Sequence, residues 1–486
     1  MITPDFTKRK NSTLCDYLYE CIKQEILLGK LKADEKLPSR RSLSSHLGVS
    51  VITVQNAYNL LISEGYLYSV EKKGFFVTKL DLKNLHATSH KKHVQESFDE
   101  LSQEKNAARG VHGSATKNDP VDFTSNSMNV EKFPFKQWSK NLRNVLYSGN
   151  SVLLSKLDPK GSIHLRKVLS VFLKEFRNMD VSPSRIVIGA GTENIFDIII
   201  KLLGRKNVFA VENPGYKKIA NLISLCGAKC IPVEIDGEGM NVTALNKSKA
   251  GVVHVSPAHH FPTGTVMSIR RRMELLSWAD KKDGRFIIED DYDSEFRFTG
   301  KPLSTLMSAD WNGHVIYMNT FSKSLAPSFR ISYMVLPESL ALKFDKTFAF
   351  CACQVSAFEQ EALADFIENG FYEKHLNRMK NFYKGLRNDL VSAVQKSPLS
   401  SCCKIEEEGS GLHFLMKVKT KKSVSALKKS LEKNGVRISS LYDYYYEEEV
   451  SQKNARLHKT LVVNYSALEK EKIPSAVEAL CRAVLQ

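Results

Sequence analysis

A lysine, Lys323, stands between two serines in an otherwise apolar loop, and an arginine, Arg330, follows it seven residues later. An amine in such a setting suits a Schiff base to an aldehyde, and the arginine suits the phosphate that would anchor that aldehyde. Upstream, the apolar run 286–288 leads into carboxylates, which places Asp290 at the edge of a sheet. An anion there can keep a pyridine nitrogen protonated and so make the ring an electron sink. Together these residues predict a site for pyridoxal 5'-phosphate (PLP), with Lys323 as the amine.

Each of these two motifs has an ordinary explanation when it is taken alone. A Ser-Lys-Ser sequence in a loop is usually solvated surface, and an aspartate after two isoleucines is usually a strand cap or the N-cap of a helix. Their order and separation favour a joint site. The segments Glu289–Phe296 and Thr320–Arg330 also resemble signatures of the fold-type I aminotransferases, and most closely those of the MocR/GabR-type regulators. The resemblance implies a domain in which Lys323 holds PLP as a Schiff base.

The length and the charge of the chain limit what surrounds this site. At 486 residues the chain is too long for one ordinary core, which predicts two or three domains. Its 42% hydrophobic and 25% charged residues are ordinary for a globular protein. A net charge of +17 suggests a nucleic-acid partner, but residues 1–80 hold only 12 Lys and Arg against 8 Asp and Glu. Charge alone therefore does not locate a DNA surface.

No segment of the sequence predicts a membrane span or a secretion signal. Residues 1–10 are polar and basic, and no run approaches the ~18 apolar residues that a span needs. The nine cysteines form no C-x-x-C pair, so reduced thiols are expected. We therefore expect a cytoplasmic protein without membrane contact. No metal is assigned, because His259 and His260 have no third ligand at metal spacing.

Residues 37–77 have the spacing of a helix-turn-helix with a wing. A short helix opens after Ser39, a turn follows at Gly48, and Ser50 caps a second helix. Two short apolar runs within residues 66–77 flank a basic tip and predict a hairpin. A generic helical hairpin explains the apolar spacing of the helices equally well, so spacing alone leaves both interpretations open.

The same block resembles the winged helix of the GntR family in its length and in the order of its elements. In that family the recognition helix enters the major groove with its first turn. Val51 stands where the family commonly has a basic residue, so part of the usual contact set and the operator sequence stay open. The resemblance implies that the first turn of this helix presents Val51, Ile52, Thr53 and Gln55 to the groove and that Arg40, Arg41, Lys72 and Lys73 hold phosphates. Ser50, the cap of this helix, also belongs to the expected DNA-binding set.

The predicted domains are a winged helix-turn-helix (α+β) at residues 1–80, a linker at 81–118 and an effector domain at 119–486. The linker is predicted to be flexible because it is rich in polar residues and holds no apolar period. By the resemblance, the effector domain has the α/β fold of type I PLP-dependent transferases, with a smaller α+β C-terminal subdomain. The resemblance also implies a head-to-tail homodimer. Its two tethered DNA-binding domains could reach two half-sites of a double-stranded DNA operator.

The resemblance extends the cofactor site beyond Lys323 and Asp290. The segment 186–194 matches the family's phosphate turn, although Glu193 stands where the family often has glutamine. Phe261 replaces the asparagine that free aminotransferases direct at the cofactor's 3'-oxygen, which leaves Tyr292 as the main donor and disfavours efficient transamination. The other cofactor-binding residues that the resemblance implies are Gly191, Thr192, Tyr216 as a stacking ring, Thr320, Ser322 and Arg330.

Two basic residues are candidates for binding a small-molecule amino effector. Arg437 offers a planar fork that suits a carboxylate, and Lys218 follows closely after Tyr216. A plain surface position explains Arg437 equally well. The resemblance implies a DNA-binding transcriptional regulator that uses bound PLP to sense an amino compound or PLP itself.

Two alternative functions remain open at this point. One is an active aminotransferase that carries an accessory DNA-binding module, and the other is a winged-helix regulator with a dead effector domain. Phe261 disfavours the first, although partial transaminase reactions fit both it and a regulator. The intact set of Lys323, Asp290 and Arg330 disfavours the second.

Overall fold

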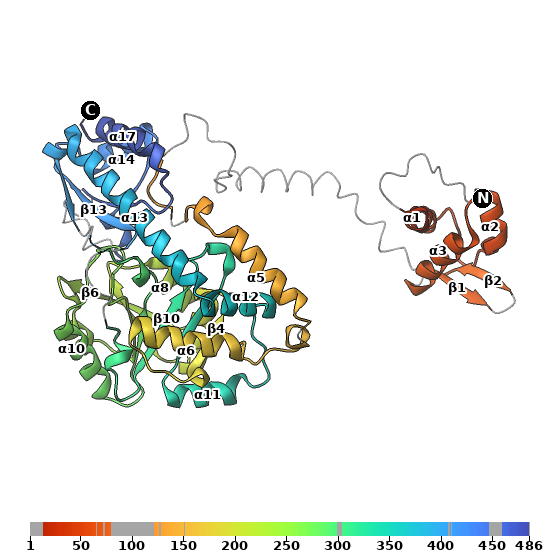
Figure 1. Ribbon diagram of the computed structural model, residues 1–486, viewed down its shortest axis with the longest axis horizontal. Coiled ribbons are helices and arrows are strands. Elements are labelled where there is room, and N and C mark those ends of the chain that lie inside the picture. The colour runs from red at the N-terminus through yellow and green to blue at the C-terminus, as the bar shows by residue number, and fades with distance from the viewer. Residues whose placement is uncertain are drawn as a thin grey trace. The chain divides into compact units, whose positions relative to one another are not determined.

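The computed structural model describes residues 13–64, 66–70, 73–78, 121–125, 128–149, 151–298, 304–406, 409, 411–446 and 459–485. The chain divides into two compact units, residues 1–115 and 116–486, drawn in Figure 1. The predicted linker, 81–118, and Lys72 lie outside the described residues. In the part of the chain that is described, no helix is long and apolar enough to cross a membrane.

Three helices and a two-stranded wing form the N-terminal unit. Their apolar faces meet in one core, in which Leu18, Leu43 and Tyr58 are almost fully buried. This arrangement confirms the predicted helix-turn-helix with a wing. The helices are α1 (Leu14–Leu27), α2 (Arg40–Leu47) and α3 (Val51–Ser63), and the antiparallel strands are β1 (Leu67–Val70) and β2 (Gly74–Val77).

Two serines determine where α2 and α3 begin, and a glycine determines where α2 ends. The hydroxyl of Ser39 accepts a hydrogen bond from the backbone N–H of Ser42 at 3.2 Å, and that of Ser50 accepts one from Thr53 at 3.0 Å. Both bonds satisfy N–H groups that lack a partner within their helix. Gly48 ends α2 with a φ of +63°, a left-handed conformation that glycine adopts without steric cost.

An eight-stranded sheet forms the centre of the effector unit, in the order β4-β11-β10-β9-β8-β5-β6-β7. Strands β10, β9, β8, β5 and β6 run parallel, whereas β11 is antiparallel to both of its neighbours and β7 to β6. The strands are β4 (Ile186–Gly189), β5 (Val208–Asn213), β6 (Lys229–Asp236), β7 (Gly239–Met240), β8 (Val252–Val255), β9 (Phe286–Asp290), β10 (Val315–Thr320) and β11 (Ser332–Val335).

Side chains alternate between the two faces of this sheet, and helices cover both faces (Figure 1). In β10, Val315 and Tyr317 join one buried cluster while Ile316 and Met318 join the other. The first cluster includes residues of α6 (Ile163–Arg177), α9 (Val242–Lys247), α10 (Ile269–Asp280) and α12 (Ala357–Glu368), and the second includes residues of α7 (Thr192–Leu203), α8 (Lys217–Leu225) and α11 (Glu338–Phe348). These three layers confirm the predicted α/β fold.

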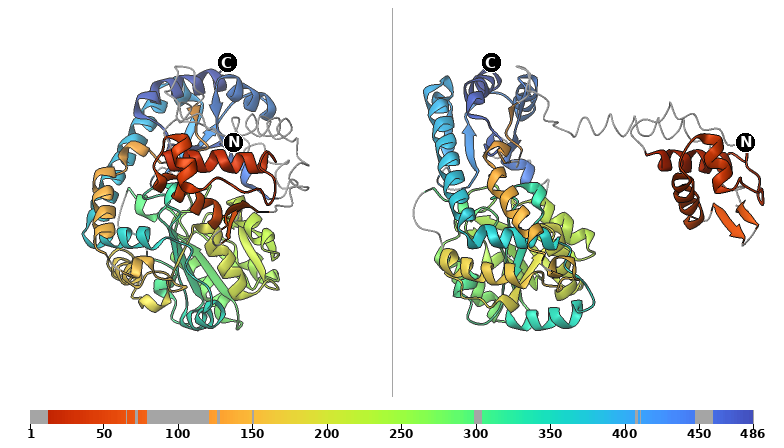
Figure 2. Two further views of the ribbon diagram at one scale, coloured as in Figure 1. Left: turned by 90° about the vertical axis from the view of Figure 1, so that its right-hand side faces the viewer. Right: turned by 45° about the vertical axis from the view of Figure 1, so that its right-hand side comes forward.

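A smaller α+β subdomain follows toward the C-terminus, as predicted. The long helix α13 (Phe371–Lys396), visible in Figure 2, connects this subdomain to the part of the unit built on the central sheet. Tyr372 lies in a core cluster of the central sheet, and Leu386 lies in the core of the small subdomain. The subdomain's sheet has the order β12-β13-β16-β15. Its elements are β12 (Cys403–Glu406), β13 (His413–Val418), α14 (Val424–Lys433), β15 (Ser439–Ser440), β16 (Thr460–Asn464) and α17 (Ile473–Leu485).

Two further pieces complete the effector unit. Strand β3 (Val121–Asp122) pairs in parallel with β14 (Val436–Arg437), so the start of the unit is joined to its small subdomain. Helix α5 (Phe135–Tyr147) packs beside α12, where Val145 and Ala362 share a small buried cluster.

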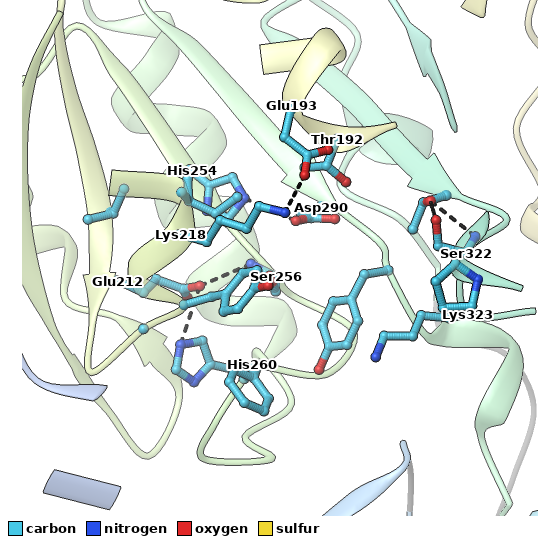
Figure 3. A pocket seen from close by; sticks show the side chains of 18 of the residues that line it. Thr192, Glu193, Glu212, Lys218, His254, Ser256, His260, Asp290, Ser322 and Lys323 are labelled. Carbon is cyan, nitrogen blue, oxygen red and sulfur yellow. Dashed lines mark hydrogen bonds and ion pairs between the residues drawn. The ribbon is translucent and has the colours of Figure 1, made fainter. Parts of the chain in front are cut away.

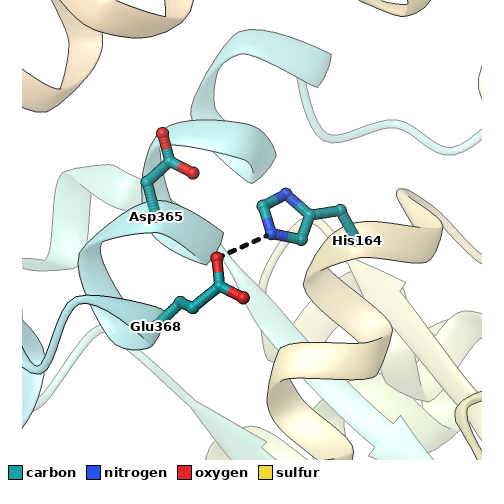
Figure 4. Close-up of side chains that lie close together, drawn as sticks. All are labelled: His164, Asp365 and Glu368. Carbon is teal, nitrogen blue, oxygen red and sulfur yellow. Dashed lines mark hydrogen bonds and ion pairs between the residues drawn. The ribbon is translucent and has the colours of Figure 1, made fainter.

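A histidine and three carboxylates join α6 to α12 (Figure 4 shows two of the carboxylates with the histidine). His164 Nδ1 lies 2.8 Å from Glu361 Oε2, and its Nε2 lies 3.3 Å from Glu368 Oε2, with Asp365 close by. The hydrogen bond to Glu361 is the main reason that the pKa of His164 rises to about 9. Carboxylates lie beside both ring nitrogens of His164, so we interpret this cluster as an ion-pair network.

This network predicts how stability changes with pH. Because the pKa of His164 is higher in the folded protein, its contribution is fully present below its ordinary value near 6.5 and is lost as the pH rises through about 9. The denaturation midpoint of His164→Gln should therefore lie below that of the wild type at pH 6 and approach it at pH 9.5. Lys167→Gln, an exposed change on the same helix, is the control. A His164→Gln difference that persists unchanged at pH 9.5 contradicts the prediction.

Candidate functional site

A cavity of about 400 Å³ lies where parallel strands of the central sheet end. Residues at or just after the carboxyl ends of β5, β8, β9 and β10 line it (Figure 3). Parallel strands end at the same edge of a sheet, which is why segments far apart in the sequence meet here. Of the predicted cofactor residues, the cavity is lined by Thr192, Tyr216, Asp290, Tyr292, Thr320, Ser322, Lys323 and Arg330, and Gly191 directly precedes Thr192.

Lys323 lies in the turn that follows β10 and directs its amine into the cavity (Figure 3). Protein encloses the amine on its other sides. This desolvation lowers the pKa of Lys323 to about 8, against a smaller opposing effect of Asp293. A larger share of the amine is therefore neutral at physiological pH than for an ordinary lysine, and the neutral form is the nucleophile.

Asp290 ends β9 and is the only carboxylate of the run Glu289–Asp293 that lines the cavity. Its Oδ2 lies 3.3 Å from Nε2 of His254, a buried residue of β8. The other acids of the run are directed elsewhere: Glu289, for example, accepts hydrogen bonds from the backbone N–H groups of Leu306 and Met307 at 2.7 and 3.0 Å. Asp290 thus presents an anion to whatever fills the cavity.

Aromatic rings form another wall of the cavity. Tyr216 meets Phe261 edge-on, with ring centroids 5.8 Å apart, and 43% of Tyr216 remains exposed. The exposed face leaves Tyr216 able to stack on a ligand ring. Tyr292 Oη lies 3.3 Å from Nδ1 of His259. Burial raises the pKa of Tyr292 well above its ordinary value, so the phenol stays protonated and can donate a hydrogen bond.

The turn before α7 forms an anion cradle. Gly191 is the N-cap of α7 with a φ of +88°, and no side chain caps this end of the helix. A Cβ at Gly191 would lie 2.2 Å from Nη2 of Arg330, so only glycine lets the guanidinium lie against the turn. Opposite, Thr320 Oγ1 donates a hydrogen bond to Ser322 Oγ at 3.0 Å. A helix N-terminus, a guanidinium and two hydroxyls together suit a phosphate.

One carboxylate lies within this cradle. Glu193, in the first turn of α7, forms ion pairs with Arg330 and with Lys218. Partial burial acts to raise the pKa of Glu193, but hydrogen bonds from Lys218, from its own backbone and from Arg330 lower it to about 2. Lys218 was predicted to face an effector; it lines the cavity, and its partner there is Glu193.

The predicted DNA-contacting residues lie on α2, α3 and the wing. Arg40 and Arg41 are exposed in the first turn of α2, and the Arg40 guanidinium lies 5.5 Å from the ring centroid of Phe75. On α3, Thr53 and Gln55 are partly buried, whereas Ile52 is 70% exposed. Lys73 is exposed next to β2, and Ser50 is the α3 cap. An exposed apolar side chain, Ile52, therefore lies at the start of the recognition helix.

Two segments of the chain match known families. Residues 118–480 match the aminotransferase class I and II family, and residues 14–77 match the gntR family of bacterial regulatory proteins. The uncharacterized HTH-type transcriptional regulator YhdI of Bacillus subtilis is 33% identical over 99% of this chain and 97% of its own length. MocR of Rhizobium meliloti, a probable rhizopine catabolism regulatory protein, is 28% identical over 96% of this chain and 93% of its own length. This chain belongs to the MocR-type regulators.

Solved structures support the fold of this MocR-type regulator's effector unit. The kynurenine aminotransferase of Pyrococcus horikoshii superimposes with a TM-score of 0.66 at 23% identity, covering 84% of this chain and 96% of that chain. An archaeal alanine:glyoxylate aminotransferase also gives a TM-score of 0.66 at 23% identity, covering 80% of this chain and 95% of that chain. The fold is thus that of the aminotransferases.

PLP is the cofactor of MocR-type regulators and of this fold, and the residues of the cavity suit it. The Cβ-free turn at Gly191 with Arg330 above it offers a place for the phosphate. Lys323 offers an amine of lowered pKa, and Asp290 an anion for the ring nitrogen. The phosphate cradle and the amine open onto one cavity, so a single ligand can engage both.

Sequence reasoning missed several polar residues of the cavity wall. Glu212 Oε2 accepts a hydrogen bond from the backbone N–H of Ser256 at 3.0 Å and lies 3.5 Å from Nε2 of His260 (Figure 3). Burial raises the pKa of Glu212 to about 8 and lowers that of His260 to about 3, so both are mostly neutral at pH 7. In the sequence, Glu212 reads as one polar residue of an apolar strand, and only its place at the strand's carboxyl end distinguishes it.

The structure does not bring Arg437 to the cavity. Arg437 is exposed on β14, where it pairs with Asp122 of β3, and it is not among the lining residues. In a MocR-type regulator with this geometry, the basic side chains at the cavity are instead Lys218, Lys323 and Arg330, with His254 and His260. A role for Arg437 in effector binding stays a prediction.

The position of Lys323 predicts where PLP attaches. The wild-type protein mixed with PLP should keep the label after borohydride reduction, and Lys323→Ala should lose it. The initial rate of attachment should rise with pH and level off above about 8, because only the neutral amine reacts. Lys218→Ala is a matched control, since its amine lines the same cavity and its label should remain. A reducible label on Lys323→Ala would refute the assignment.

Proposed function

We propose that this MocR-type regulator senses an amino compound through PLP held on Lys323 and answers by changing its binding to DNA. The observation that carries the proposal is the joint presence, in one chain, of a winged helix-turn-helix and a cavity in which Lys323, Asp290 and Arg330 converge. The proposed cofactor-binding residues are those that line or adjoin the cavity: Gly191, Thr192, Tyr216, Asp290, Tyr292, Thr320, Ser322, Lys323 and Arg330.

Each residue has a defined task in this proposal. When bound, PLP supplies an aldehyde carbon that can exchange the lysine for the amine of a ligand. Lys323 would be the amine that holds PLP, and its pKa near 8 would let the free amine take up or give back a proton at physiological pH. Asp290 holds the proton of the ring nitrogen, and Tyr292 donates from its phenol. Tyr216 and Phe261 exclude water from one side.

Phe261 favours a sensor over an efficient enzyme. Its ring is held edge-on against His413 and Tyr444 at 5.0 and 5.1 Å, so an apolar side chain occupies a position from which an amide could donate a hydrogen bond. With fewer donors, less charge can be stabilised on the ligand during a reaction. An active aminotransferase with an accessory DNA module is the alternative, because Lys323 and Asp290 permit partial reactions.

A second candidate for the signal is PLP itself. It is favoured by the ion pair between Glu193 and Arg330, which places an internal anion where the phosphate is expected to bind. A relative whose name concerns the same cofactor's precursor supports it: the HTH-type pyridoxine biosynthesis transcriptional regulator PdxR of Corynebacterium glutamicum is 26% identical over 88% of this chain. Both candidates use the same cavity and the same lysine.

Sensing and turnover can be distinguished by spectroscopy. With PLP bound, candidate amino compounds should shift the visible absorption of the protein, while keto acid should not accumulate beyond one equivalent per site. The reason is that exchange at Lys323 needs no catalytic donor at the position of Phe261. Sustained keto-acid production with an added oxo acid, at rates on the order of 1 per second, would favour the aminotransferase alternative.

The DNA-binding unit is proposed to act in pairs, on a head-to-tail homodimer of effector units. Arg40→Ala with Arg41→Ala should weaken binding to all duplexes and reduce the salt dependence by about one unit of slope per lost phosphate contact. Gln55→Ala or Ile52→Ala should instead change sequence preference, by about 1–3 kcal/mol at a contacted base pair. Lys30→Ala, which removes an exposed cation in the turn after α1, is the control.

Binding-site selection from random duplexes, followed by titration at several salt concentrations, measures both effects. Selected sites should contain two half-sites, because two linked heads gain from effective concentration. Selection of single half-sites, bound as tightly as paired ones, would contradict the paired arrangement.

A further inference from the structure

The anion cradle at the start of α7 already contains an anion of the chain itself. Glu193 is about a third exposed and forms an ion pair with the guanidinium of Arg330, which lies against Gly191. The same carboxylate also accepts a hydrogen bond from Nζ of Lys218 in the first turn of α8. The guanidinium that would otherwise serve a phosphate is thus shared with a carboxylate, and Lys218 binds that same carboxylate.

The Glu193 carboxylate affects phosphate binding through its negative charge as well as through its position. A phosphate dianion gains most from Arg330 if both guanidinium N–H groups on one side are available for two parallel hydrogen bonds. Glu193 takes up part of that capacity and adds a negative charge near the phosphate. With its pKa near 2, Glu193 stays charged across the physiological range.

We propose that Glu193 is a built-in competitor for the phosphate of PLP at Arg330, and that Lys218 controls how strongly it competes. This proposal rests on the proposed PLP site. When phosphate binds, Arg330 turns from the carboxylate to the phosphate, and Lys218 remains as the partner of Glu193. Lys218 therefore lowers the cost of releasing Arg330, although its amine need not touch the phosphate.

As a consequence, the protein binds PLP with lower affinity than the residues of the cavity would provide without Glu193. Occupancy then follows free PLP at higher concentrations, because a weaker site saturates later. A regulator that never released PLP could report only on amino compounds. With Glu193 in place, the chain is able to report on the supply of PLP as well.

The competition can be measured on the full-length protein freed of PLP. Equilibrium dialysis gives the dissociation constant of PLP for the wild type, Glu193→Gln, Lys218→Ala and the double variant. Glu193→Gln keeps the shape and removes the charge, and it should bind PLP about fivefold more tightly, as expected for a partly exposed charge interaction. Asp197→Asn is the matched control, because it removes a carboxylate one turn further along α7 that pairs only with Lys201 among the described cations; its binding should not change.

The role of Lys218 follows from the double variant. Lys218→Ala should bind PLP more weakly than the wild type, and this loss should largely disappear when Glu193 is already Gln. Inorganic phosphate, tested as a competitor of PLP, should likewise gain affinity in Glu193→Gln, which locates the effect at the phosphate rather than at Lys323.

Three results would overturn the proposal. If Glu193 competes, Glu193→Gln must bind PLP more tightly than the wild type does. Weaker or equal binding therefore refutes the competition. A Lys218→Ala loss that persists in full beside Glu193→Gln would make Lys218 a direct phosphate ligand. If neither the wild type nor any variant keeps a borohydride-stable label, the PLP site itself is wrong, and this outcome is distinct from labelled proteins of equal affinity.

Discussion

Parallel pairing of β5, β8, β9 and β10 is the constraint on which the site depends. It brings Glu212, His254, Asp290 and Thr320 to one edge, although more than a hundred positions separate the first from the last. The strands are apolar on both faces because helices cover both, so polar side chains concentrate at the strand ends. The cavity is therefore a consequence of how the sheet is built, and the chemistry depends on which residues stand at the last one or two positions of each strand.

Behind the cavity, the acidic run after β9 is stable only because each acid has its own partner. Asp291 pairs with the buried Arg177 and accepts a hydrogen bond from Tyr317 at 2.7 Å, while Asp293 lies 2.9 Å from Nδ1 of His259. An unpaired buried carboxylate would cost several kcal/mol or take up a proton. These partners come from α6, β10 and the loop after β8. They orient Asp290 and Tyr292 between them, because consecutive residues of the run are fixed on alternate sides.

The sequence predicted the fold class through its resemblance to a known family. It also brought together the residues that line the cavity, because they belong to local motifs that carry the same resemblance. Lys323 with Arg330, and the run around Asp290, are examples. Contacts between segments that are distant in the sequence could not be predicted from the sequence. Nothing in the sequence connects Lys218 with Glu193, or His260 with Glu212, since these contacts depend on how helices and strand ends meet in three dimensions. The effector-binding role of Arg437 was predicted from its residue type alone and stays a prediction, since Arg437 lies on β14 and is not among the residues that line the cavity.

A ligand can shift a protein between conformations only by binding them with different affinity. The cavity offers contacts that such a difference could involve, because part of its wall belongs to the small subdomain. The carbonyl of Tyr444 accepts a hydrogen bond from the N–H of Gly215 at 3.1 Å, and His413 Nε2 lies 3.1 Å from the carbonyl of Pro262. Phe261 packs against both Tyr444 and His413. A ligand that displaces Phe261 must therefore act on the contacts between the two subdomains, whereas one that leaves it in place need not.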